Sequence, residues 1–144
     1  MNPLRGLSAK AILLGWITDI AGSVVLSLLV ELLALGLRQL FPDLAPSSRH
    51  SILLAVCALA GSAMTGVAGY VAGRIGRDAP LANAAALAVL SELLTFLLRQ
   101  NAAPAWFSWW SYLAAPLAAL LGGLLAARHR AARLSATPPG RVQA

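Results

Sequence analysis

Charged residues are scarce in this 144-residue sequence. Asp, Glu, Lys and Arg make up 11% of it, whereas 59% of its residues are hydrophobic and the mean hydropathy is +0.76. A water-soluble chain of this length cannot bury so much apolar surface in one core, but a bilayer accepts apolar runs of about 20 residues. The composition therefore excludes an ordinary soluble domain and indicates an integral membrane protein.

Cysteine and histidine are almost absent. The single Cys57 lies in an apolar run, so no internal disulfide can form. His50 and His129 have no Cys, Asp or Glu at the spacing of metal ligands. No nucleophile and base stand together in a motif either. The sequence therefore predicts no metal, no cofactor and no enzymatic activity.

Acidic residues are fewer than basic ones, which gives a net charge of +6. The basic residues flank the apolar runs and do not form a patch interleaved with aromatic side chains, as nucleic-acid-binding surfaces do. We therefore expect these basic residues to interact with the lipid bilayer and not with nucleic acid.

Long apolar runs occur four times, separated by segments rich in proline and other turn residues. The first run exceeds the apolar part of a signal peptide, which is about 7 to 15 residues long, so we expect it to be retained. The predicted fold is an all-α, integral membrane four-helix bundle. It forms one transmembrane domain over residues 1–134, with spans at about 11–37, 52–73, 81–98 and 109–127, followed by a disordered basic tail over residues 135–144.

The basic residues also predict an orientation. Eight of them lie at the N-terminus, between the second and third spans, or at the C-terminus, and three lie on the other side. Because Lys and Arg are retained in the cytoplasm, both termini should be cytoplasmic in a multi-pass protein of a bacterial inner membrane. The eight are Arg5, Lys10, Arg74, Arg77, Arg128, Arg130, Arg133 and Arg141, and the three are Arg38, Arg49 and Arg99.

An internal repeat links the two halves of the sequence. Residues 31–39 and 92–100 are identical at six of nine positions, including Glu, Arg and Gln, and residues 69–74 resemble 123–128. This pattern predicts two duplicated helical hairpins, related as parallel repeats because an even number of spans separates them. The alternative is a chance match between Leu-rich and Ala-rich helices.

Small residues recur at every fourth position in the second and fourth spans. Such seams let helix backbones approach closely, which is how helices associate where lipid removes the hydrophobic driving force. The partner of each seam is either another span of this chain or another molecule, so a homo-oligomer or a complex with another membrane protein is expected. The seams are Gly61, Thr65, Gly69 and Gly73 in the second span, and Ala115, Ala119, Gly123 and Ala127 in the fourth.

Three acids lie inside apolar runs: Asp19, Glu31 and Glu92. A carboxyl group in hydrocarbon is costly unless it is protonated, paired or wetted, so Glu31 and Glu92 should face the interior of the bundle. Asp19 should lie near the inner boundary, within reach of water. Ser23 and Ser27 continue the step of four from Asp19 to Glu31, so these four residues form one polar ridge.

The acids allow two interpretations. In the first, they form a relay that exchanges protons or ions during transport. In the second, which we favour, they are interhelical hydrogen-bond clamps.

Residues 69–75 (GYVAGRI), 79–84 (APLANA) and 18–23 (TDIAGS) carry a resemblance. They resemble uncharacterised small bacterial four-helix inner-membrane proteins with a Gly-Tyr-Val-Ala-small-Arg helix exit, which implies a fold and a location but no activity. Residues 19–23 (DIAGS) are also faintly similar to the acidic motif in the first helix of small multidrug resistance transporters. This chain departs from that family in its single orientation, its parallel repeat and its aromatic residues, which cluster at the outer interface. These aromatic residues are Trp106, Trp109, Trp110 and Tyr112.

These observations predict a non-enzymatic structural or accessory component of the inner membrane. The alternative is a small proton-coupled transporter or ion-conducting protein that uses the intramembrane carboxylates.

Overall fold

The computed structural model describes residues 6–97 and 104–135, and within these ranges the chain is helical without a strand. All four helices are long and apolar enough to cross a membrane, so the prediction of an all-α four-helix membrane bundle is confirmed. Polar turns at the helix ends make the first, second and fourth helices longer than the predicted apolar runs. The helices are α1 (Ala9–Leu40), α2 (Pro46–Ile75), α3 (Pro80–Leu97) and α4 (Ala105–Ser135). Ser135 thus ends α4, and the rest of the predicted tail, residues 136–144, lies outside the described residues.

The helix boundaries follow from local chemistry. The Ser8 hydroxyl caps α1 by accepting a hydrogen bond of 3.3 Å from the backbone N–H of Ala11. Proline opens α2 and α3, at Pro46 and Pro80, where its missing N–H would have no helical partner. The α2–α3 turn closes when Gly76 donates its N–H to the Ala72 carbonyl at 2.9 Å.

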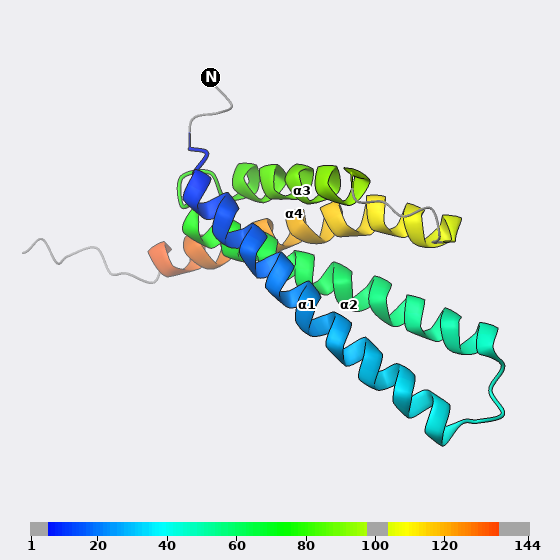
Figure 1. Cartoon of the computed structure of the whole chain (residues 1–144). Helices are drawn as coiled ribbons and strands as arrows, with labels where there is room; N and C mark the ends of the chain where they lie inside the picture. The colour runs from blue at the N-terminus through cyan, green and yellow to red at the C-terminus, as the bar shows by residue number, and fades with distance from the viewer. Residues whose placement is uncertain (1–5, 98–103, 136–144) are drawn as a thin grey trace, which may run out of the picture.

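The helices form two hairpins that meet at one end of the molecule and diverge toward the other (Figure 1). We call the first end, which holds the start of α1, the α2–α3 turn and the end of α4, the terminal end, and the other the loop end. In the described ranges α2 contacts all three other helices, whereas α1 and α4 do not touch. Almost all buried residues therefore come from the halves of the helices nearest the terminal end.

Where α2 and α4 lie closest, their backbones are in direct contact. A Cβ atom on Gly69 would overlap the carbonyl oxygen of Ala119, and one on Gly122 would overlap the carbonyl of Gly66. A Cβ atom on Gly73 would lie 3.1 Å from the Cα of Gly123. Close approach through small residues is the packing that lipid-embedded helices favour.

The two predicted seams only partly coincide with this contact. Gly69, Gly73, Ala119 and Gly123 lie in it, but Gly61 faces open space and Ala115 and Ala127 are half-buried. The reason is the helical period: four residues turn an α-helix through about 400°, so a strict step of four rotates by about 40° at each step. Thr65 accordingly faces α1, and the contact is completed by Gly66, Gly122 and Ala126.

A buried amide fastens the terminal end. Asn83, which is fully buried, accepts a hydrogen bond of 2.8 Å from the backbone N–H of Ser8. Its Nδ2 group donates to the carbonyls of Ala79 at 2.8 Å and Gly6 at 3.1 Å. One side chain thus joins the segment before α1 to the start of α3.

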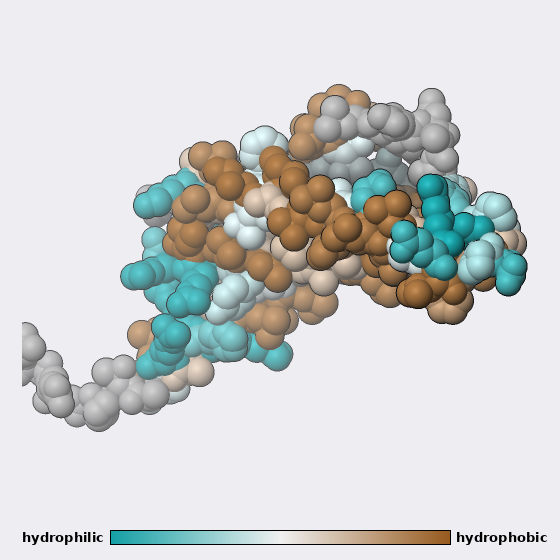
Figure 2. Space-filling view, turned by 60° about the horizontal axis from the view of Figure 1, so that its bottom comes forward, coloured by the Kyte–Doolittle hydropathy of each residue, from teal (hydrophilic) through white to brown (hydrophobic). Residues whose placement is uncertain are grey.

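The outer surface suits a bilayer. Figure 2 shows a broad apolar band that separates polar residues gathered at the two ends of the molecule. Leucines are exposed on all four helices, among them Leu28, Leu93 and Leu121. In a chain that spans a membrane, such side chains contact lipid or another membrane-embedded helix.

The duplication of the two hairpins stays a prediction. In two equivalent hairpins, a contact between α2 and α3 would be matched by one between α4 and α1. Within the described residues α2 contacts α3, but α1 does not contact α4. Arg99 and Gln100, two of the matching positions in the second copy, lie outside the described residues.

Candidate functional site: a carboxylate bridge within the bundle

The carboxylate of Asp19 joins three helices. Its Oδ1 atom accepts a hydrogen bond of 3.1 Å from the Thr65 hydroxyl on α2, and its Oδ2 atom accepts one of 3.0 Å from the Ser91 hydroxyl on α3. Both oxygens of the only acid in the terminal half of α1 therefore have donors. We call Asp19, Thr65 and Ser91 the carboxylate bridge.

Small residues on α1 bring the bridge together. Gly15 lies one turn before Asp19, and a Cβ atom there would be 2.9 Å from the Cβ of Ala72 and 3.0 Å from the Ala68 carbonyl. This close approach sets Asp19 against Thr65, one turn away along α2. Leu87 and Trp16 pack around the same contact, which forms the small apolar core of the protein.

A groove of about 310 Å³ runs beside the bridge between α1 and α3. The polar residues that line this groove lie on one face of α1 and one face of α3, in parts of both helices where most other residues are apolar. The lining residues are Trp16, Asp19, Ile20, Ser23, Val24, Ser27, Ser91, Leu94 and Thr95. The predicted ridge of Asp19, Ser23 and Ser27 therefore borders a space shared with α3.

Glu92 lies next to the bridge but outside it. The side chain is half-buried, and its Oε2 atom is buried without a hydrogen-bond partner among the described residues. A buried polar atom without a partner costs about 1 to 3 kcal/mol, so packing alone does not account for the position of the Glu92 carboxyl group.

Glu31 does not face the interior of the single chain, and the prediction that it does so is wrong. The residue is exposed, as are Ser23 and Ser27, and the Ser27 hydroxyl donates to the backbone carbonyl of Ser23 at 2.9 Å. The cause is the divergence of the hairpins, which carries this part of α1 away from α3 (Figure 1). Glu31 and Glu92, matched in sequence, thus have different surroundings.

The importance of Asp19 was underestimated from sequence. It was expected near the membrane boundary in contact with water, whereas the structure makes it the acid with the most interhelical hydrogen bonds. Thr65 was assigned to a packing seam, and Ser91 was not among the predicted site residues. The available signal was that each helix facing Asp19 carries a hydroxyl-bearing residue within its apolar run.

No family model, curated protein or solved structure matches this chain. In the part of the chain that the structure describes, no three His, Cys, Asp or Glu side chains gather as metal ligands. The chemistry that the site offers is that of a hydrogen-bonded carboxylate next to a polar groove.

Proposed function

We propose that the protein is a non-enzymatic structural or accessory component of a bacterial inner membrane that works by associating with a second copy of itself. The observation that carries the proposal is the exposed carboxyl group of Glu31 within the apolar part of α1. An acid that faces lipid is costly, and a neighbouring chain that covers it lowers that cost by offering hydrogen-bond donors.

The exposure of α1 also supports an association surface around Glu31. Only 6% of the most apolar stretch of α1 is buried, against 22% of the corresponding stretch in each of the other three helices. Leu28, Leu32 and Leu35, which lie within one turn of Glu31, are all more than half exposed. An interface on this face would cover apolar surface together with the acid.

The charge distribution supports an orientation with both termini in the cytoplasm. Among the described residues, the terminal end carries Lys10, Arg74, Arg77, Arg128, Arg130 and Arg133, and the loop end carries Arg38 and Arg49. Retention of Lys and Arg on the cytoplasmic side favours the terminal end as the inner one.

Cysteine crosslinking in liposomes tests the association. In a Cys57→Ser background, Leu35→Cys places a thiol one turn from Glu31, and Leu113→Cys places a matched exposed thiol on α4. We expect a crosslinked dimer from Leu35→Cys and little from Leu113→Cys. Adding Glu31→Leu should remove the dimer, whereas Glu31→Gln, which still forms hydrogen bonds, should keep it. A monomer at both positions, or a dimer indifferent to Glu31→Leu, would refute the proposal.

The groove beside Asp19 favours a second candidate, a small proton-coupled or ion-conducting protein. Asp19 lines this groove, and Glu92 nearby has an oxygen without a partner among the described residues. Proteoliposomes carrying a pH-sensitive dye distinguish the candidates. Proton flux above that of empty liposomes, lost in folded Asp19→Asn or Glu92→Gln variants, would establish transport and displace the accessory role. Flux equal to that of empty liposomes would exclude proton transport.

A further inference from the structure

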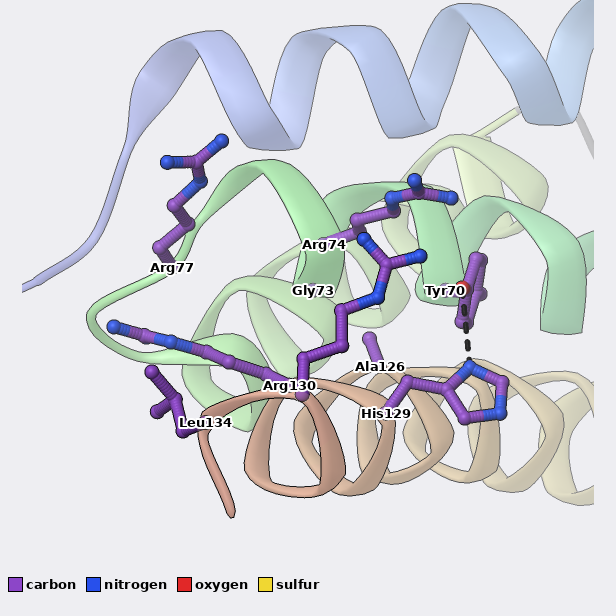
Figure 3. Close-up of a pocket in the computed structure, with 9 residues that line it drawn as sticks. Tyr70, Gly73, Arg74, Arg77, Ala126, His129, Arg130 and Leu134 are labelled. Carbon is purple, nitrogen blue, oxygen red and sulfur yellow. Dashed lines mark hydrogen bonds between the residues drawn. The ribbon is translucent and has the colours of Figure 1, made fainter. Parts of the chain in front are cut away.

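A cavity of about 350 Å³ lies at the terminal end between α2 and α4 (Figure 3). It is separate from the carboxylate bridge and shares no residue with the groove beside it. Four of the nine lining residues are arginines and none is an acid. The lining residues are Tyr70, Gly73, Arg74, Arg77, Ala126, His129, Arg130, Arg133 and Leu134.

The walls of the cavity are well defined. Gly73 and Ala126 are buried where α2 and α4 approach each other, and a Cβ atom on Gly73 would lie 3.1 Å from that of Ala126. On one side Tyr70 and His129 are joined by a hydrogen bond of 3.2 Å between the hydroxyl and Nδ1, with the donor set by the imidazole tautomer. Their rings meet edge to face, with centroids 5.8 Å apart. These contacts fix the distance between the two helices.

Arg74, Arg77 and Arg130 line this cavity, and no carboxylate lies among its described lining residues. Figure 3 shows the side chains of Arg74 and Arg130 extending from α2 and α4 into the same space. In ranges 6–97 and 104–135, no carboxylate pairs with Arg74, Arg77 or Arg130. Like charges gathered in one cavity repel each other, and a bound anion would relieve that repulsion. The planar guanidinium group is especially suited to phosphate, which it can bind through two parallel hydrogen bonds.

The position of the cavity along the two helices indicates which kind of phosphate compound it would bind. The apolar run of α2 ends at Gly73, immediately before Arg74, and that of α4 ends at Ala127, two residues before His129. The cavity therefore lies where hydrocarbon gives way to headgroups. Val67 and Leu125 continue the same two helix faces into the apolar band and are about half exposed. A phosphate in the cavity would thus have apolar surface below it for acyl chains.

We propose that this cavity binds the phosphate headgroup of an anionic phospholipid. Arg74 and Arg130 hold the phosphate oxygens, Arg77 adds positive charge at the outer rim, and the Tyr70–His129 pair limits the cavity on its other side. Basic pockets between transmembrane helices are a recurrent form of lipid-headgroup recognition. The site is independent of the proposed association through α1.

Native mass spectrometry of the full chain in detergent tests this site. The probes are dioleoyl phosphatidylglycerol, the zwitterionic dioleoyl phosphatidylcholine and inorganic phosphate. The test variant carries Arg74→Gln and Arg130→Gln. The control carries Lys10→Gln and Arg128→Gln, which remove the same charge from exposed positions at the same end but outside the cavity.

We expect phosphatidylglycerol to bind more tightly than phosphatidylcholine, with affinity about tenfold or more lower in the test variant and nearly unchanged in the control. An equal loss in the control would show diffuse charge attraction and overturn the site. Equal binding of both lipids would also overturn it. Displacement of the lipid by inorganic phosphate at similar concentration would assign the cavity to a soluble phosphate and overturn the lipid proposal.

Folding of the variants is checked by circular dichroism melting. Both arginines are exposed, so their replacement removes no core contact. If the double variant still melts early, the single Arg130→Gln variant repeats the comparison against Arg128→Gln, two residues away on the same helix.

Discussion

The carboxylate of Asp19 on α1 accepts a hydrogen bond of 3.0 Å from the hydroxyl of Ser91 on α3, 72 positions further along the chain. This bond joins the two hairpins, because α1 belongs to the first and α3 to the second. Together with the bond from Thr65, it makes Asp19 the polar link among α1, α2 and α3.

Removal of the Ser91 hydroxyl should weaken the contact between the hairpins. Interhelical hydrogen bonds in membranes contribute about 0.6 kcal/mol on average, so Ser91→Ala should lower the free energy of unfolding by roughly that amount. Ser27→Ala is the control, because the Ser27 hydroxyl bonds only to the backbone of its own helix. Unfolding in mixed micelles measures both. Equal stability of the two variants would show that the bond contributes nothing.

Replacement by alanine should affect the stability of the protein differently at two glycines on α2. Gly69→Ala places a methyl group against the Ala119 carbonyl, and overpacking of this kind costs about 1 to 3 kcal/mol. Gly61→Ala meets nothing within 4 Å and should be neutral or stabilising by up to about 1 kcal/mol, because alanine favours the helix. Thermal unfolding of the two variants checks the pair. A stable Gly69→Ala protein would contradict the observed α2–α4 contact.

Loss of the Asn83 amide should release the segment before α1. Asn83→Leu keeps the approximate volume but leaves the carbonyls of Gly6 and Ala79 without the amide donor, at a cost of about 1 to 3 kcal/mol. Hydrogen exchange at the Ser8 N–H, which bonds to the Asn83 side chain, should rise while exchange in α4 stays constant. Thr95→Val, an exposed change on the same helix, is the control. Unchanged exchange at Ser8 would rule out this fastening role.

The indole of Trp110 should matter more than that of its neighbour. Its Nε1 group donates to the Ala58 carbonyl at 3.1 Å and to the Ser62 hydroxyl at 3.0 Å, so it connects α4 to α2 toward the loop end. Trp110→Phe should lower the free energy of unfolding by about 1 kcal/mol. Trp109→Phe changes a side chain that is 67% exposed and should have little effect. If chemical denaturation gave the reverse order, the assigned bonds would be wrong.

The fold class could be predicted because it depends on run length and on composition. Both are read directly from the sequence, and so are the proline-marked starts of α2 and α3. The close approach of α2 and α4 was only partly foreseen. A strict step of four identified Gly69 and Ala119 but missed Gly122, since the contact follows the real helical period.

The site was harder to predict because it depends on how the helices are arranged. Glu31 and Glu92 occupy matching positions in a repeated segment, and sequence alone gave them equal roles. The divergence of the hairpins leaves Glu31 exposed and Glu92 half-buried. Asp19 gained its importance from Thr65 and Ser91, which lie on two other helices and have no fixed spacing from it in the sequence.

The divergence of the hairpins also gives the protein a wedge shape. Figure 1 shows the helices close together at the terminal end and spread apart toward the loop end. A wedge displaces more lipid area from one leaflet than from the other, so the surrounding bilayer relaxes by bending. In a bilayer, a wedge of this kind would favour a membrane that is convex on the loop-end side.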